Sequence, residues 1–202
     1  MKKFIYLISP NQVTKNFYKK LDSVLSSNKI KFFQLRLKKY SFEEILEIGK
    51  KIKVITDKYN VKLIINDSPH LAKKINADGC HLGQSDMSIE KAKKILKSNK
   101  IIGLTCHGSK KLILNSIKYR PNYIALGSFF KSKLKPEAKK ADINLIGWSK
   151  KNNRIPIVAI GGINNKNYKI LLESGANYLA ISSFIWNNPR LKPKQALKNF
   201  IK

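Results

Sequence analysis

Short apolar runs alternate with longer amphipathic segments along the whole chain. Eight runs rich in Ile, Val, Tyr and Phe have the length of strands, at residues 4–9, 32–38, 62–67, 79–83, 101–107, 123–130, 156–163 and 178–185. Segments with helical spacing lie between and after them, at residues 14–27, 41–59, 69–75, 88–96, 109–119, 143–152, 165–174 and 194–201. This alternation predicts parallel strands joined by helices.

The segment 41–59 shows the helical pattern most clearly. Its isoleucines recur at spacings of three and four, at Ile45, Ile48, Ile52 and Ile55. It opens on Ser41, and Glu44 follows three residues later, which matches a capping box at a helix start.

Eight strand–helix units fit into 202 residues with no linker and no low-complexity tract. This predicts one domain over residues 1–202, an α/β fold closed into a (β/α)8 TIM barrel. The alternative is an open doubly wound sheet, which usually has fewer units and a Gly-rich first turn. In the barrel, active sites form at the carboxyl ends of the strands, so we expect unusual polar residues to gather there.

The second run carries polar side chains where a buried strand is expected. Side chains on a strand alternate between faces, so Gln34, Arg36 and Lys38 share one face, and Leu35 and Leu37 the other. An edge strand with a solvated face explains this pattern. A site that receives a phosphate or pyrophosphate explains it equally well, because unpaired buried cations are costly.

Two carboxylates follow neighbouring strands, Asp67 after the third and Asp86 after the fourth. Together they are suited to Mg²⁺, which prefers oxygen ligands and completes its shell with substrate phosphates and water. Each aspartate alone also fits a helix cap, for the helices that start near Pro69 and Ser88.

Strands seven and eight end in a pattern typical of a phosphate site. Gly161 and Gly162 precede the helix predicted at 165–174, and Ser182 and Ser183 add hydroxyls after the eighth strand. A tight turn is the alternative for the glycine pair.

Two other pairs of side chains stay ambiguous or point to packing. His81 and His107 fit either a packed histidine or a proton carrier. Cys80 and Cys106 lack the spacing of a metal site and are expected to pack.

The formal net charge is +29, and lysine supplies nearly all of the excess. The lysines are spread along the predicted helices and no nucleic-acid motif accompanies them, so we expect no nucleic-acid partner. The charge would still attract small anionic molecules. No apolar run is long enough to span a bilayer, and the first residues lack a cleavage site, so we expect a cytoplasmic protein with no membrane partner.

Together these segments resemble the thiamine phosphate synthase family. The resemblance rests on residues 34–38, 65–67, 77–86, 103–107, 123–127, 158–163 and 180–183. It implies a transferase that couples 4-amino-2-methyl-5-hydroxymethylpyrimidine pyrophosphate to 4-methyl-5-(2-phosphoethyl)thiazole and releases pyrophosphate. It also implies a dissociative, Mg²⁺-assisted mechanism in which pyrophosphate leaves before the thiazole nitrogen attacks.

The resemblance also implies roles for residues at matching positions. The pyrophosphate would meet Gln34, Arg36, Lys38 and Lys135, with Lys38, Lys135 and Thr105 as the catalytic residues. The pyrimidine would meet Asn66 and Thr105, and Mg²⁺ would meet Asp67 and Asp86. The thiazole phosphate would meet Ser132, Gly162, Ser182 and Ser183.

Two departures from the family pattern concern ligand contacts. Leu134 replaces a threonine in the loop after the sixth strand, which removes one hydrogen bond, and Ser85 replaces an acidic residue before Asp86. There are two alternatives to a thiamine phosphate synthase. One is a thiazole tautomerase on the same barrel, and the other is a non-catalytic basic binding barrel. The tautomerase would need a proton carrier such as His107 but neither carboxylate, so Asp67 and Asp86 argue against it.

Overall fold

The computed structural model of the protein describes residues 4–97, 99–131 and 139–200. Its strands form a closed barrel in chain order. The strands are β1 (Ile5–Ile8), β2 (Ile30–Leu35), β3 (Lys62–Asn66), β4 (Gly79–Leu82), β5 (Ile101–His107), β6 (Tyr123–Gly127), β7 (Ile157–Ile160) and β8 (Tyr178–Ile181). The predicted (β/α)8 barrel is confirmed, and the open sheet is excluded. The predicted site residues Ser132 and Lys135, with Leu134, lie outside the described residues.

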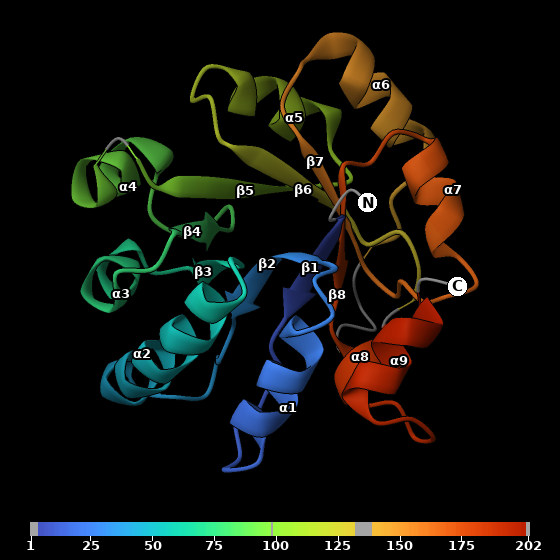
Figure 1. Ribbon diagram of the computed structural model, residues 1–202. Helices are drawn as coiled ribbons and strands as arrows, with labels where there is room; N and C mark the ends of the chain where they lie inside the picture. The colour runs from blue at the N-terminus through green and yellow to red at the C-terminus, as the bar shows by residue number, and fades with distance from the viewer. Residues whose placement is uncertain (1–3, 98, 132–138, 201–202) are drawn as a thin grey trace.

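Helices surround the barrel in the order of the chain (Figure 1). They are α1 (Phe17–Leu25), α2 (Phe42–Lys58), α3 (Pro69–Ile75), α4 (Ile89–Leu96), α5 (Lys110–Ile117), α6 (Asn144–Asn152), α7 (Tyr168–Glu173), α8 (Ser183–Trp186) and α9 (Pro193–Phe200). The capping box predicted at α2 is present, with Ser41 and Glu44 each bonding the other's backbone N–H. The short helix α8 was not predicted.

Every neighbouring pair of strands is parallel, and β1 closes the ring by pairing with both β2 and β8. In the closing pair, Ile5 lies opposite Leu179 and Leu7 opposite Ile181. Because all strands run in one direction, all their carboxyl ends meet at one rim. The polar residues predicted at strand ends therefore share one face of the molecule.

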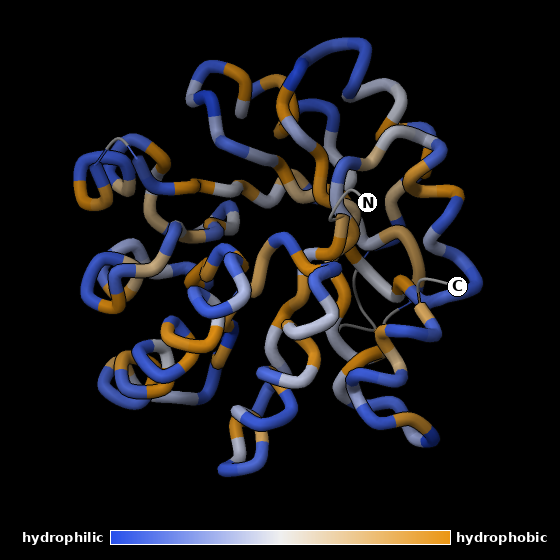
Figure 2. Tube along the Cα trace, viewed as in Figure 1, coloured by the Kyte–Doolittle hydropathy of each residue, from blue (hydrophilic) through white to orange (hydrophobic). Residues whose placement is uncertain are grey.

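Alternation along the strands divides the core into two layers. The inner layer fills the barrel with Tyr6, Phe32, Ile64, Tyr123, Ala125, Val158 and Ala180. The outer layer, which is larger, lies between the strands and the helices and includes Leu7, Phe33, Leu63 and Leu126. Hydrophobic positions follow the strands, and hydrophilic ones dominate the outer surface of the helices (Figure 2). Cys80 and Cys106 are buried and form no disulfide, as expected for packing residues.

The strand β2 ends at Leu35, earlier than the predicted run 32–38. After it, the Arg36 N–H donates to the Ser9 hydroxyl at 3.0 Å instead of joining a strand ladder. Alternation still holds within the strand, because Gln34 follows the inward Phe32 by two residues and is buried, with 3% exposed. Since β2 lies between β1 and β3 in a closed ring, the edge-strand alternative is wrong.

The helix predicted at 165–174 begins later, at Tyr168. A turn precedes it, in which the Asn164 N–H donates to Asn167 Oδ1 at 2.8 Å. The predicted start of this helix at residue 165 is therefore three residues too early, and the turn lies between Gly162 and the helix N-terminus.

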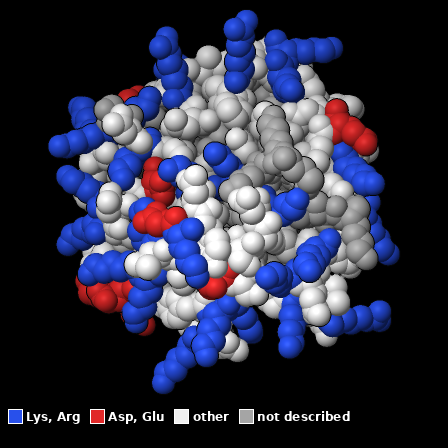
Figure 3. All heavy atoms as spheres, in the orientation of Figure 1, with Lys and Arg blue, Asp and Glu red and all other residues white. Residues whose placement is uncertain are grey.

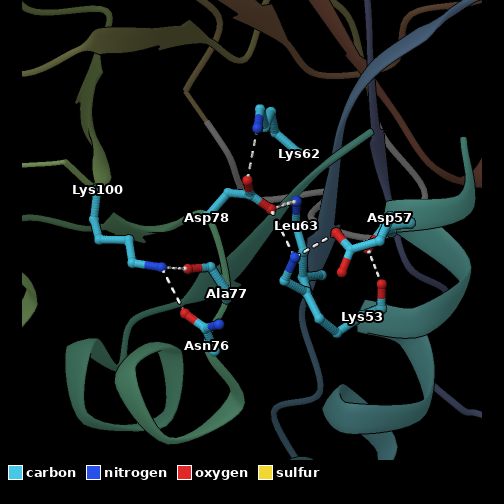
Figure 4. Close-up of polar contacts among 9 residues, drawn as sticks. Lys53, Asp57, Lys62, Leu63, Asn76, Ala77, Asp78 and Lys100 are labelled. Atoms are coloured by element: carbon cyan, nitrogen blue, oxygen red, sulfur yellow. Dashed lines mark hydrogen bonds and ion pairs between the residues drawn. The ribbon is translucent and has the colours of Figure 1, made fainter. Parts of the chain in front are cut away.

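The opposite end of the barrel is tied together by Asp78, which precedes β4 (Figure 4). Its carboxylate accepts hydrogen bonds from Lys62 at 2.9 Å and from the Leu63 N–H at 3.0 Å, and Lys53 of α2 lies 3.7 Å away. The nearby Lys100 donates to the Ala77 carbonyl at 2.8 Å. This network joins one helix to the amino ends of two strands, far from the rim that carries the predicted site.

Lysine and arginine side chains are spread around the face shown in Figure 3, with few acidic groups among them. This distribution matches the lysine excess expected from the sequence. Among the described residues, the helices are too short or too polar to traverse a bilayer.

Candidate functional site at the carboxyl ends of the strands

Asp67 directly follows β3 and turns its side chain into the rim. Its backbone is left-handed, with φ 63°, and its N–H donates to the His81 carbonyl of the neighbouring strand at 2.8 Å. The Asp67 Oδ2 lies 2.6 Å from Lys38 Nζ, and this ion pair is partly exposed. The pair joins the end of β3 to the segment after β2, as the hypothesis of a rim site requires.

Asp86 lies beside this pair, after β4. Its Oδ2 accepts a hydrogen bond from the Gly83 N–H at 2.7 Å. Burial raises the pKa of Asp86, and the neighbouring Asp67 carboxylate raises it further, while Gly83 and Lys38 oppose the change. The two carboxylates and one lysine therefore form a compact charged cluster, which we call the Lys38–Asp67–Asp86 cluster.

Neither aspartate caps a helix. Ser68 caps α3 by accepting from the Leu71 N–H, and Ser88 caps α4 by accepting from the Lys91 N–H. Because serines carry out both capping functions, the alternative explanation of the aspartates is wrong. Both carboxylates remain available at the rim.

His81 and Thr105 connect this cluster to the barrel interior. His81 Nε2 lies 2.8 Å from Thr105 Oγ1, and Nδ1 lies 3.0 Å from the Tyr123 hydroxyl. Burial lowers the pKa of His81 to about 4; Asp67 opposes this shift, and Arg36 adds to it. His81 is therefore a neutral, hydrogen-bonded side chain at physiological pH, rather than an open proton carrier.

Other polar residues at or just after the ends of β2, β3, β4 and β5 also reach the rim. Arg36 lies near enough to influence His81, and Asn66 is paired with His81 in the β3–β4 ladder. The Gln84 side chain donates to the Thr105 carbonyl at the point where the β5–β6 register shifts. His107 follows that shift, is exposed, and makes no side-chain hydrogen bond to the described residues.

The glycine pair after β7 is required by close packing. Gly161 and Gly162 have φ of 107° and 60°, and a Cβ on Gly162 would lie 2.3 Å from the Lys131 carbonyl oxygen. The Phe130 N–H donates to the Gly161 carbonyl at 3.1 Å. This packing accounts for both glycines as a turn against the loop after β6, so the phosphate role of Gly162 stays a prediction.

The serines after β8 lie where the barrel closes. Ser182 donates to the Ser9 carbonyl at 3.1 Å, and Ser183 is the first residue of α8. Trp186 of the same helix donates to the Ile8 carbonyl at 2.7 Å. These bonds hold α8 over the end of β1, and the Ser182 proton is engaged in them.

Contacts among the described residues thus bring together six of the residues singled out from the sequence. They are Arg36, Lys38, Asp67, His81, Asp86 and Thr105. Gln34 lies on the inner face of β2, while Gly162, Ser182 and Ser183 follow β7 and β8, and the described contacts do not join them directly to these six residues. Sequence reasoning gave no role to Gln84 or Tyr123. Tyr123 could have been found from the sequence, because it places a hydroxyl at an inward position of an otherwise apolar strand.

Comparisons with known proteins agree with this architecture. The family model described as thiamine monophosphate synthase matches residues 5–185. The chain belongs to this family. It is 55% identical over 198 residues to the thiamine-phosphate synthase of Pelagibacter ubique, covering 98% of this chain and 95% of the relative. The corresponding protein of Erythrobacter litoralis is 36% identical, with 95% and 92% covered. The resemblance drawn from the motifs is confirmed, and with it the expectation of a family of transferases.

Solved structures show the same relationship. The thiamine phosphate pyrophosphorylase from Pyrococcus furiosus superposes with a TM-score of 0.87 at 28% identity, covering 98% of this chain and 94% of that one. An orotidine 5'-phosphate decarboxylase from Pyrococcus horikoshii shares the fold alone, with a TM-score of 0.66 at 16% identity.

Proposed function

We propose that the protein couples 4-amino-2-methyl-5-hydroxymethylpyrimidine pyrophosphate to 4-methyl-5-(2-phosphoethyl)thiazole, giving thiamine phosphate and pyrophosphate. The observation that carries this proposal is the Lys38–Asp67–Asp86 cluster at the carboxyl ends of the strands. The name of the relatives, thiamine-phosphate synthase, supports thiamine phosphate as the product.

The cluster suits a leaving group that gains negative charge. When pyrophosphate departs, charge builds up on its bridging oxygen, and fixed cations nearby lower the barrier. Lys38 is held by Asp67 at 2.6 Å, and Arg36 lies on the same side, near His81. Lys135 and Gln34 complete the proposed set of pyrophosphate contacts, Lys135 lying outside the described residues.

The donor set of the cluster fits Mg²⁺. The Asp67 carboxylate raises the pKa of its neighbour Asp86, and two carboxylates so placed favour a cation between them; the described residues hold no group of three metal-binding side chains. Mg²⁺ accepts such a sparse site, because it keeps waters and binds substrate phosphates as well. When bound by Asp67 and Asp86, it would neutralise charge on the departing pyrophosphate.

The remaining side chains orient the two organic fragments. Asn66 and Thr105 flank His81 on neighbouring strands and would hold the pyrimidine. The buried aromatic layer beneath them excludes water from the cation that forms when pyrophosphate leaves. Gly162, Ser182, Ser183 and Ser132 would hold the thiazole phosphate, so that its nitrogen faces that cation.

The test is to incubate the purified chain with both substrates and Mg²⁺, and to measure thiamine phosphate and pyrophosphate. We expect the two products in equal amounts, and no product when EDTA removes the metal. Formation of neither product by the folded chain would contradict the proposal.

The tautomerase alternative is tested in the same preparation. It requires a proton carrier, and the described contacts leave His81 fully engaged and His107 without a partner. Isomerisation of a thiazole carboxylate phosphate without coupling would favour that alternative. The non-catalytic alternative predicts binding of both substrates with no turnover.

A further inference from the structure

A continuous chain of hydrogen-bonding groups crosses the inside of the barrel. The Tyr6 and Tyr123 hydroxyls lie 2.7 Å apart, Tyr123 meets His81 Nδ1 at 3.0 Å, and His81 Nε2 meets Thr105 Oγ1 at 2.8 Å. Both tyrosines are buried, with 2% and 1% exposed. The chain therefore leads from the apolar interior to a residue of the rim.

The barrel reserves space for this arrangement. A Cβ on Gly103 would lie 2.0 Å from Cζ of Tyr123, so only glycine at that position lets the ring sit where it does. The His81 and Tyr123 rings stack with 7° between their planes and centroids 5.6 Å apart. The positions of the imidazole and the phenol are thus fixed by packing as well as by hydrogen bonds.

A chain of this type has only two consistent directions. Each hydroxyl has one proton, and a neutral imidazole has one N–H and one bare nitrogen. If Thr105 donates to His81, its oxygen offers only lone pairs to a ligand. If His81 donates to Thr105, the Thr105 proton points elsewhere, and among the described residues it has no other hydrogen-bond partner.

The Tyr6 end of this hydrogen-bond chain favours the direction in which His81 donates to Thr105. Burial raises the pKa of both tyrosines, so both keep their protons. Tyr6 is buried, and among the described residues the Tyr123 oxygen, 2.7 Å away, is the acceptor within reach of its hydroxyl proton. When Tyr6 donates to Tyr123, the Tyr123 proton is left for His81 Nδ1, and the imidazole proton lies on Nε2.

We infer that Tyr6, Tyr123 and His81 are positioning residues that hold the Thr105 hydroxyl as a hydrogen-bond donor towards the mouth of the barrel. The group it meets is an acceptor atom of the substrate, a pyrimidine ring nitrogen or an oxygen of the diphosphate. This last step rests on the proposed function, whereas the tautomer of His81 does not. A substrate analogue with a donor at that point would be rejected, because two protons would face each other.

The tautomer is measured directly by NMR on protein with ¹⁵N-labelled histidine. The signals of His81 are assigned by their loss in His81→Gln. We expect a protonated Nε2 and a bare Nδ1 in the free protein at neutral pH. A protonated Nδ1 would overturn the inference, whether or not the protein makes thiamine phosphate.

The positioning role is tested by a double-mutant cycle in the coupling assay. Tyr123→Phe removes one hydroxyl from the chain, and we expect kcat/KM to fall about tenfold, the worth of one hydrogen bond. In the Thr105→Val background, where the hydroxyl is missing, Tyr123→Phe should change kcat/KM less than about twofold. With Thr105→Ser, which restores a hydroxyl, the effect of Tyr123→Phe should return.

Tyr178→Phe is the matched control, because Tyr178 is a tyrosine that packs against the same inner layer, on Phe32, without joining the hydrogen-bond chain. We expect it to leave kcat/KM unchanged. If Tyr123→Phe and Thr105→Val act independently, Tyr123 supports the fold only, and the inference fails. Absence of thiamine phosphate with the wild-type chain would instead contradict the proposed function and leave the NMR result standing.

Discussion

Lys38 and Lys39 are adjacent lysines with different surroundings. Lys38 Nζ lies 2.6 Å from Asp67, whereas Lys39 is exposed, with no ion pair to the described residues. We predict that Lys38→Gln lowers kcat/KM for thiamine phosphate formation by about 10- to 100-fold, the worth of a charged hydrogen bond. Lys39→Gln removes the same charge and should stay within about twofold of wild type. Equal effects would show that only the overall charge matters.

Gly162 and Gly147 give a second matched pair. A Cβ at Gly162 meets backbone oxygens at 2.3 and 2.8 Å, and φ is 60°, so we predict that Gly162→Ala destabilises the fold by about 1–3 kcal/mol. Gly147 lies within α6 with nothing within 4 Å of its added Cβ, so Gly147→Ala should stabilise by about 0.5–1 kcal/mol. Denaturant unfolding measures both, and a stable Gly162→Ala variant would contradict the geometry.

Single residues differ in how far their sequence context predicts them. The carboxylates Asp67 and Asp86 were predicted because Asp67 ends one apolar run and Asp86 lies three residues after the next. The choice between ligand and cap needed coordinates, because Ser68 and Ser88 lie one and two residues further on. The contact of Tyr6 with Tyr123 depends on the register of strands 117 residues apart, which no local pattern encodes.

At the scale of elements, the centres of strands and helices followed from periodicity, and their ends did not. The run 32–38 continues its alternation past Leu35, yet the strand ends there. The Ser9 hydroxyl donates to the Arg36 carbonyl and accepts from the Arg36 N–H, in place of a neighbouring strand. In the same way, hydrogen bonds among Asn164, Lys166 and Asn167 form a turn where a helix was predicted. Side chains that bond the backbone compete with regular structure at both places.

The amino ends of β3 and β4 depend on Asp78, whose carboxylate is 16% exposed. Burial alone would raise the pKa of Asp78, but Lys62, the Leu63 N–H and Lys53 outweigh it, and the pKa is lowered. We predict that Asp78→Asn costs about 1–3 kcal/mol of unfolding free energy at pH 7. Asp57→Asn, which removes a more exposed partner of Lys53, should cost less than about 1 kcal/mol.

The pH dependence of this stabilisation has a definite sign. A group with a lowered pKa in the folded state stabilises above its ordinary value of 3.8, and this contribution is lost as the pH falls through the lowered value. Wild type and Asp78→Asn should therefore differ at pH 7 and converge in strong acid. Urea unfolding across this pH range measures the difference, and a constant gap would exclude the ion pairs as its cause.

At the scale of the whole molecule, the net charge of +29 surrounds a site for anionic substrates. Such a field raises the rate of encounter, and salt screens it over a Debye length of about 10 Å at 0.1 M. We predict that kcat/KM for both phosphorylated substrates falls several-fold when KCl rises from about 0.05 to 0.5 M, while kcat changes little. Sucrose at matched viscosity is the control. A kcat/KM that is independent of salt would show that the lysines do not guide the substrates.

The closed barrel itself was predictable because the local sequence patterns and the overall order of elements agree with it. Apolar runs, helical spacing and polar strand ends recur in eight units, and parallel strands brought their carboxyl ends to one rim. Which side chains touch across that rim was not predictable, since it depends on the stagger of strands around the ring.

The most direct test of the central claim is calorimetric titration of Mg²⁺ into the protein with saturating pyrophosphate. Asp86→Asn removes one proposed ligand charge, and Glu173→Gln removes the same charge from an exposed position on α7. We predict that wild type and Glu173→Gln bind Mg²⁺ alike, and that Asp86→Asn binds it at least about tenfold more weakly. Unchanged binding in Asp86→Asn would contradict the assignment of the Lys38–Asp67–Asp86 cluster as the site of metal and diphosphate.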